Sequence, residues 1–223
     1  SLMRTAPVAL AFLHDPVALA TSARAISDLT HADTDAGDAC VLWCLAIRHA
    51  VLTGGLDVRI GLDALLADRR ALWLARIEEA ETLEPADFER NGWVVHAFQG
   101  AWSSTVNRTA VTCGPEVPAD ELRATLERAV RGGRDTDTVA AIAGSLVGAA
   151  HGASAVPAEW RRIVHGWPEL TAADLVRMGV LAGAGGVPDG DGWPVAPQQD
   201  YSGWPGLDVL VQHPLDAGLW LGG

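Results

Sequence analysis

Apolar side chains recur along the first 183 residues at the three- and four-residue spacing that is typical of α-helices. Asp15 followed by Pro16 indicates a helix start, and the pattern predicts that this helix runs to about residue 29. A second helix is expected to begin at Asp33 or Thr34 and to end at Gly54. Its apolar positions leave almost no polar face, so we expect it to be buried on most sides.

The same spacing predicts further helices along the chain, at residues 62–81, after the Asn91-Gly92 break, and at 118–130, 139–152, 157–164 and 171–183. In the first of these, the pattern places Arg69 and Arg76 on the solvent side. In the last, Thr171 and Asp174 have the spacing of a capping pair. The pattern as a whole predicts an all-α bundle.

The composition changes at Ala184, where Gly, Pro and Trp replace Ala and Leu. We therefore expect residues 1–183 to form the helical domain and residues 184–223 to form an irregular tail or the start of an appended module. Residues 207–212 are predicted to be one strand of a short β-hairpin. The tail's tryptophans are interpreted as anchors that pin it to the bundle, with a sugar-binding or docking surface as the alternative: Trp193, Trp204 and Trp220.

Composition and charge restrict the possible functions. The chain has 223 residues, of which 49% are hydrophobic and 20% charged, which is typical of a globular protein. Its formal charge of −12 disfavours a nucleic-acid partner, because such binding draws its affinity from basic residues on phosphates. All 16 basic residues are arginine, which indicates a GC-rich bacterial genome.

Three cysteines are too few for a disulfide scaffold in a chain of this size, and we expect a cytoplasmic protein. Cys40 and Cys44 lie one helical turn apart and are interpreted as core residues. Charged or polar residues interrupt the apolar runs before about 18 residues, so no transmembrane span is predicted.

The most distinctive chemistry lies in the segment Gly132-Gly133-Arg134 and the four residues after it, Asp135-Thr136-Asp137-Thr138. A Gly-Gly turn permits unusual backbone dihedrals, and Asp and Thr accept hydrogen bonds from the first turn of a helix. A plain helix cap is therefore one interpretation. The other is a metal site, because carboxylate and hydroxyl oxygens suit Mg²⁺, Ca²⁺ or Mn²⁺.

Small residues repeat every four positions after this segment, at Ala140, Gly144, Gly148 and Gly152. Such a stripe lets neighbouring backbones approach closely, so we expect a central helix. The two aspartates would then be partly desolvated, which favours a compensating cation or hydrogen bonds.

Residues 133–152 resemble the signature of the ADP-ribosylglycohydrolase family. Four other segments are similar to the family's motifs in order and spacing: residues 1–7 to the end of its Gly-Asn-Gly-x-x-Met-Arg-x-x-Pro loop, 29–31 to its Thr-His element, 92–98 to the helix before the aspartate motif, and 156–160 to its Ile-Pro-x-x-Trp segment. The resemblance covers roughly residues 1 to 165. It implies a compact orthogonal multi-helix bundle.

The resemblance also implies a function, the magnesium-dependent hydrolysis that releases ADP-ribose from a modified acceptor such as an arginine or serine side chain. It implies two Mg²⁺ ions, with Mn²⁺ as a substitute, held partly by Asp135, Asp137 and Thr138. It places the substrate beside the following residues: Ser1, Met3, Arg4 and His31. The partners expected are ADP-ribose or an ADP-ribosylated protein, with no membrane.

Family members also carry an N-terminal portion that supplies further metal ligands and a catalytic carboxylate, and this sequence does not contain its motifs. We therefore expect the chain to be the C-terminal part of a longer protein and to be inactive alone, with no catalytic residue of its own. The alternative function is that of a non-catalytic family member, acting as a binding, immunity or structural protein. A small-molecule or nucleic-acid-linked ADP-ribose substrate stays open as well.

An acidic segment close to His31 has the carboxylates of a calcium loop: Asp33, Asp35 and Asp38. The EF-hand pattern needs glycine at its sixth position and glutamate at its twelfth, and the residues there are Asp38 and Cys44. The three aspartates are therefore interpreted as first-turn charges that the helix dipole favours.

Overall fold

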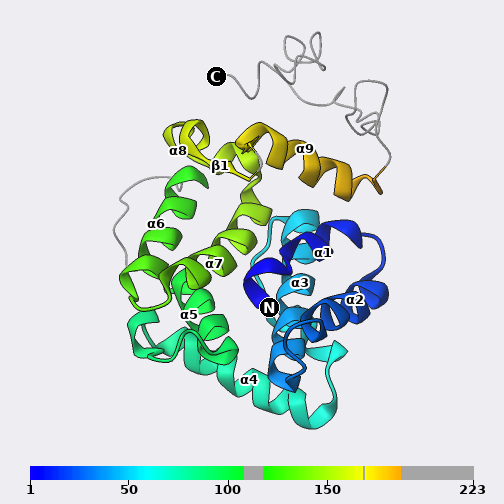
Figure 1. Cartoon of the computed structure of the whole chain (residues 1–223). Helices are drawn as coiled ribbons and strands as arrows, with labels where there is room; N and C mark the ends of the chain where they lie inside the picture. Colours follow the sequence, from blue (N-terminus) through cyan, green and yellow to red (C-terminus); the bar gives the residue numbers. More distant parts are fainter. Residues whose placement is uncertain (108–117, 168, 187–223) are drawn as a thin grey trace, which may run out of the picture. The chain divides into compact units, whose positions relative to one another are not determined.

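A computed structural model describes residues 1–107, 118–167 and 169–186 of the chain. The described part is helical apart from one small hairpin, which confirms the predicted all-α class (Figure 1). It divides into two compact units, Ser1–Pro157 and a second unit that begins at Ala158. The predicted domain boundary at residue 184 falls near the end of the described residues and stays a prediction.

The first unit contains α-helices (α) and short 3₁₀ helices (η). In chain order they are η1 (Leu2–Arg4), α1 (Ala6–Ala11), α2 (Pro16–Asp28), α3 (Thr34–Thr53), η2 (Arg59–Ala64), α4 (Ala67–Thr82), η3 (Pro85–Asp87), α5 (Val94–Val106), α6 (Pro118–Arg131), α7 (Thr136–His151) and η4 (Ala153–Ala155). The helix expected at 62–81 is interrupted at Leu65 and Leu66, where the backbone is extended between η2 and α4.

Helix α3 is the centre of this unit. It packs against α1, α2, α5, α7 and both η1 and η2, and most of its residues are buried from Ala36 to Ala50. The expected start and end are confirmed: Asp33 caps the helix through hydrogen bonds from two backbone amides, and Gly54 ends it at φ 75°. Cys40 and Cys44 are buried free cysteines, as predicted.

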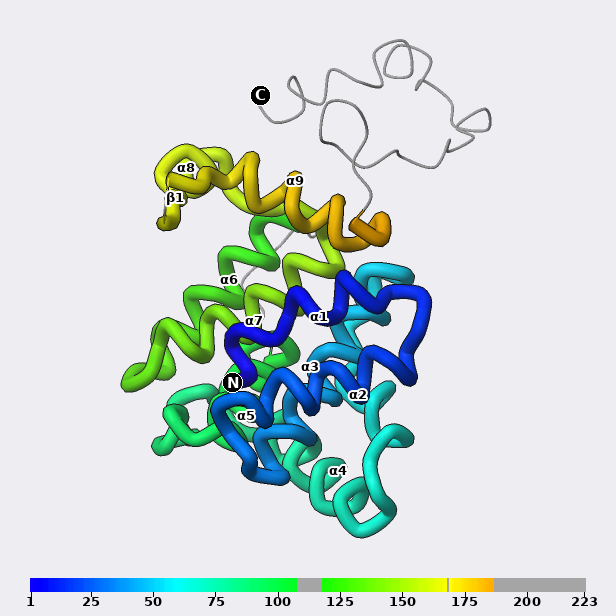
Figure 2. The backbone as a smooth tube through the Cα atoms, turned by 45° about the vertical axis from the view of Figure 1, so that its right-hand side comes forward, coloured from blue at the N-terminus to red at the C-terminus, as the bar shows by residue number. Residues whose placement is uncertain are grey.

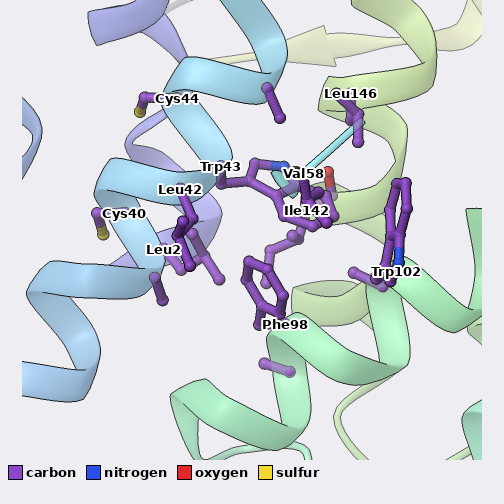
Figure 3. Close-up of a cluster of buried hydrophobic side chains, with 14 of the residues drawn as sticks. Leu2, Cys40, Leu42, Trp43, Cys44, Val58, Phe98, Trp102, Ile142 and Leu146 are labelled. Carbon is purple, nitrogen blue, oxygen red and sulfur yellow. Dashed lines mark hydrogen bonds between the residues drawn. The ribbon is translucent and has the colours of Figure 1, made fainter. Parts of the chain in front are cut away.

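Aromatic side chains join α3 to its neighbours in the core (Figure 3). The indole nitrogen of Trp43 donates to the carbonyl of Ile142 at 3.1 Å, which ties α3 to α7. The ring of Phe98, from α5, contacts two tryptophan rings edge-on. Its ring centre lies 5.1 Å from that of Trp43 and 5.0 Å from that of Trp73 on α4. Such edge-to-face pairs stabilise a core beyond the area that they bury.

Helix α7, which carries the aspartate motif, lies well inside this unit, in line with the expectation from the small-residue stripe. It packs against α3, α5, α6 and η1, and only Asp137 and Ala141 of its residues are exposed. Of the stripe, only Gly144 permits a close approach, because a Cβ there would lie 3.0 Å from Leu126 of α6. Gly148 faces open space instead.

The solvent-facing assignment of Arg69 and Arg76 is also wrong. The guanidinium groups of Arg69 and Arg76, on α4, both bind the carboxylate of Asp35. Arg69 also binds the carboxylate of Asp38 at 2.7 Å. Asp38 is 2% exposed and receives two further hydrogen bonds, from Arg24 at 2.5 Å and from the Trp73 indole at 3.1 Å. Buried carboxylates need such partners, so this network fixes α2 and α4 on α3.

Helix α3 is also long and apolar enough to cross a membrane, by length and composition alone. In its most apolar 18-residue window, 67% of the residues are buried among the other helices. A core helix passes the same test, so this helix is weak evidence for a membrane span.

The second unit contains α8 (Ala158–Ile163), β1 (His165–Gly166), β2 (Leu170–Thr171) and α9 (Ala172–Gly183). The two strands pair antiparallel, a hairpin that the hydrophobic pattern did not predict. The predicted capping pair is confirmed, since Thr171 and Asp174 exchange hydrogen bonds at the start of α9. The hairpin expected at residues 207–212 and the tail tryptophans lie outside the described residues.

Candidate metal and ligand site

The turn before α7 has an uncommon backbone conformation. Gly133 and Arg134 have φ of 77° and 61°, the left-handed region, which a non-glycine residue rarely adopts. The side chain of Asn91 spans the turn: its Nδ2 donates to the carbonyl of Gly133 at 2.9 Å, and its Oδ1 accepts from the amide of Asp135 at 3.1 Å. Asn91 is only 3% exposed, so these bonds are largely shielded from water.

Asp135 occupies the N-cap position of α7, yet its side chain makes no capping hydrogen bond. Its backbone carbonyl accepts from the amide of Val139 at 3.3 Å. The carboxylate instead lies over Gly92, where a Cβ would be 3.5 Å from Oδ2. The plain-cap interpretation of Asp135 and Thr136 is therefore wrong for both side chains, and the Asp135 carboxylate is available to a ligand.

Asp137 and Thr138 follow in the first turn of α7. Asp137 is exposed, so the expected partial desolvation applies to Asp135 but not to Asp137. The Thr138 hydroxyl donates to the sulfur of Met3 at 3.4 Å, although the two residues are 135 positions apart in sequence. Figure 2 shows η1, at the N-terminal end of the tube, beside α7. The fold thus brings together two of the sequence segments that carry the family resemblance.

The other residues predicted to contact the ligand make hydrogen bonds near the end of α2. The Ser1 hydroxyl accepts from Ser27 at 2.9 Å. Arg4 Nη2 donates to the Thr30 hydroxyl at 2.5 Å, and that hydroxyl lies 2.7 Å from Nδ1 of His31. Arg4 and His31 are therefore linked through Thr30, and the His31 ring does not bond a backbone carbonyl.

Arg134, the other arginine considered for an anionic substrate, is engaged elsewhere. Its guanidinium donates to the carbonyl of Ala86 at 3.2 Å and lies 3.7 Å from the carboxylate of Glu89. This arrangement holds the left-handed turn against η3.

The donors at the start of α7 fit a hard divalent cation in kind. Two carboxylates and a hydroxyl, from Asp135, Asp137 and Thr138, are oxygen ligands of the type that Mg²⁺ and Mn²⁺ take. The amides of a helix's first turn do not neutralise them, because the Asp135 side chain makes no cap. Within the described part of the chain, no group of three or more His, Cys, Asp or Glu side chains could hold a metal ion. These three residues therefore form a partial site.

Sequence reasoning missed several residues around this site, above all Asn91, Trp93 and Thr30. Trp93 precedes α5 and is 40% exposed, with the Arg90 guanidinium 5.2 Å from its ring centre and the His96 ring at 5.2 Å. Burial and the nearby Arg90 charge lower the pKa of His96, whose Nδ1 accepts from the Arg90 amide. An Asn-Gly-aromatic sequence at a helix start was the available signal.

The helical bundle and the Asp-Thr-Asp-Thr sequence at the start of α7 agree with the glycohydrolase class that the sequence resemblance implied. The chain is a member of the ADP-ribosylglycohydrolase family, whose model matches residues 1–186. This match confirms the family that the sequence motifs indicated.

Two relatives show how much of such a protein this chain covers. It is 27% identical over 186 residues to human ADP-ribosylhydrolase ARH3, covering 70% of the chain and 51% of the relative. It is 28% identical over 176 residues to the bovine protein of the same name, covering 66% and 48%. The chain thus spans about half the length of these curated relatives. No solved structure matches it.

Proposed function

We propose that the protein carrying this chain is a Mg²⁺-dependent hydrolase that removes ADP-ribose from a modified acceptor, an arginine or serine side chain of a protein. The observation that carries the proposal is the Asp135 carboxylate, which sits at a helix start without capping it, beside Asp137 and Thr138. Family membership and the similarity to proteins named ADP-ribosylhydrolase support the same reading.

In this proposal, Asp135, Asp137 and Thr138 hold two Mg²⁺ ions together with carboxylates from a segment that precedes residue 1. Bound there, Mg²⁺ supplies concentrated positive charge that orients the ribose hydroxyls and makes a nearby water more acidic. The same preceding segment supplies the catalytic carboxylate.

The reaction is a hydrolysis at the anomeric carbon of the distal ribose. A bond forms between a water oxygen and this carbon, the bond from the carbon to the acceptor atom breaks, and a proton from the water passes to the acceptor. Positive charge develops on the ribose as the acceptor leaves, and the carboxylates of Asp135 and Asp137 lower its energy.

The remaining groups bind and orient the substrate. Ser1, Met3 and Arg4 line the turn of η1 beside Thr138, and His31 joins them through Thr30. Such a side is suited to the diphosphate, because hydroxyl, guanidinium and imidazole groups donate to phosphate oxygens. Trp93 is a partly exposed aromatic residue that directly follows Gly92, over which the Asp135 carboxylate lies.

The test is Asp137→Asn in the protein that carries this chain, assayed for Mg²⁺-dependent release of ADP-ribose from a modified protein. Loss of groups that only support a metal ligand typically costs 10- to 100-fold, so loss of a ligand should lower the rate by about 100-fold or more. Asp63→Asn is the matched control, because the Asp63 side chain is 93% exposed and pairs with Arg70 on the η2–α4 side. Unchanged release in Asp137→Asn would refute the proposal.

Calorimetry separates the enzyme from its non-catalytic alternative. The enzyme should bind both Mg²⁺ and ADP-ribose, and Asp137→Asn should weaken both. A wild-type protein that binds neither ligand would support the binding, immunity or structural role instead.

A further inference from the structure

Three side chains at the end of η1 form a hydrogen-bonded chain, and the donor and acceptor of each bond can be assigned. Arg4, the last residue of η1, donates from Nη2 to the Thr30 hydroxyl at 2.5 Å and to the carbonyl of Ile26 at 3.4 Å. The same hydroxyl lies 2.7 Å from Nδ1 of His31, in the connection between α2 and α3. The backbone amide of His31 donates to the carbonyl of Ser27, which fixes the start of this connection.

The donor inventory limits how the protons are arranged. A guanidinium has only donors, so the Thr30 oxygen must accept from Arg4. An oxygen that accepts from a cation becomes a weaker acceptor for a second donor, while its own O–H becomes a stronger donor. The favourable partner for that O–H is Nδ1 of His31, at 2.7 Å. The opposite arrangement would place two donors, one of them cationic, on the same oxygen.

We propose that Arg4 and Thr30 are positioning residues that fix His31 as the neutral tautomer with its proton on Nε2. With Nδ1 accepting from Thr30, the exposed edge of the His31 ring presents an N–H donor. Diphosphate oxygens only accept hydrogen bonds, so this tautomer selects an acceptor-rich ligand. The ligand part rests on the proposed function, since it takes ADP-ribose as the molecule that His31 contacts.

The tautomer is measured in the ligand-free chain, by long-range ¹H–¹⁵N NMR of the histidine rings, with His31→Gln to assign the signals. In the wild type, His31 Nδ1 should show the shift of an unprotonated nitrogen and Nε2 that of a protonated one. Thr30→Val and Arg4→Met should both give mixed tautomer populations. Thr21→Val is the matched control, because its hydroxyl donates to the carbonyl of Val17 on the same helix, and it should leave the His31 signals unchanged.

Two results would overturn the proposed role of Arg4 and Thr30: a protonated Nδ1 in the wild type, or His31 signals in Thr30→Val identical to those of the wild type. An amide spectrum that retains the wild-type dispersion shows that the variants are folded.

A separate titration of the protein that carries this chain tests the ligand part. Thr30→Val should weaken ADP-ribose binding about 2- to 10-fold, the effect of one hydrogen bond. Unchanged affinity would overturn that part. A wild type that binds no ADP-ribose would refute the proposed function. The NMR signals of the His31 ring would still test whether Arg4 and Thr30 fix its tautomer.

Discussion

Asn91 binds the turn before α7 on both sides, and its acceptor contact is with the backbone amide of Asp135. One buried side chain at the start of α5 therefore determines where a candidate metal ligand of α7 lies. The turn contains Arg134 at φ 61°, a conformation that costs free energy for any residue with a Cβ. The two Asn91 hydrogen bonds offset this cost, and the geometry of the site depends on them.

Asn91→Ala is expected to lower the free energy of unfolding by about 1–3 kcal/mol, because it leaves a half-buried carbonyl and a half-buried amide without their partner. It should also weaken Mg²⁺ binding by about 10-fold or more, as loss of a group that orients a ligand does. Urea unfolding and a Mg²⁺ titration measure the two effects.

Asn107→Ala is the control for that variant. Asn107 donates to the carbonyl of Leu83 at 2.6 Å, at the opposite end of α5 from the aspartate turn. Asn107→Ala should lower the free energy of unfolding by a similar amount and leave the Mg²⁺ affinity unchanged. If the two variants weaken Mg²⁺ binding equally, Asn91 acts only through stability.

Helix α7 offers a matched pair of glycine substitutions. Gly148→Ala should raise the free energy of unfolding by about 0.8–1 kcal/mol, because alanine is the better helix former and nothing lies within 4 Å of the new Cβ. Gly144→Val should lower it by about 1–3 kcal/mol, since its side chain would press on Leu126 from a Cβ already 3.0 Å away. Urea unfolding measures both; a Gly144→Val protein as stable as the wild type would contradict the close packing of α6 on α7.

Asp135 and Asp137 could be found from the sequence because they lie two positions apart at the start of one helix. The role of Asn91 could not, because its two partners lie 42 and 44 residues away. The same limit explains Arg69 and Arg76. A periodic pattern treats any arginine as a solvent residue, whereas their carboxylate partners on α3 are 31 to 41 positions distant. The signal available was Asp38, a carboxylate next to the long apolar run of α3.

The small-residue stripe predicted a close helix contact correctly at Gly144 but not at Gly148, for a related reason. Four-residue spacing shows which residues share a helix face, but not whether another helix lies over that face. Gly144 meets α6, whereas Gly148 meets nothing within 4 Å and Gly152 ends the helix at φ 75°. Only the tertiary structure shows which of these glycines packs against another helix, which faces open space and which ends the helix.

The loss of folding stability at acid pH should depend on Asp35. Burial alone would raise its pKa, but hydrogen bonds from Arg76 and Arg69 outweigh burial and hold the pKa below its ordinary value. A depressed pKa stabilises the fold above the unfolded value of about 4, and this contribution is lost as the pH falls through the lower folded value. Asp35→Asn should therefore destabilise the protein at pH 7, and its difference from the wild type should shrink below about pH 4.

Urea unfolding at a series of pH values measures this difference. Asp63→Asn is the control, because the Asp63 side chain is 93% exposed and such surface pairs contribute about 0–1 kcal/mol. It should follow the wild-type curve throughout. A constant difference between Asp35→Asn and the wild type down to pH 3 would show that the Asp35 charge does not stabilise the fold.

Trp93 is expected to stack on the ADP-ribose ligand, because it is 40% exposed and directly follows Gly92, the residue that Asp135 overlies. Stacking of a base on an aromatic ring contributes about 1–3 kcal/mol, so Trp93→Ala should weaken ADP-ribose binding about 5- to 150-fold. Trp93→Tyr should retain most of the affinity. Trp167→Ala removes another tryptophan, 92% exposed and in the second unit, and should leave binding unchanged. Calorimetric titration with ADP-ribose measures all three, and equal affinity of Trp93→Ala and the wild type would place the base on another surface.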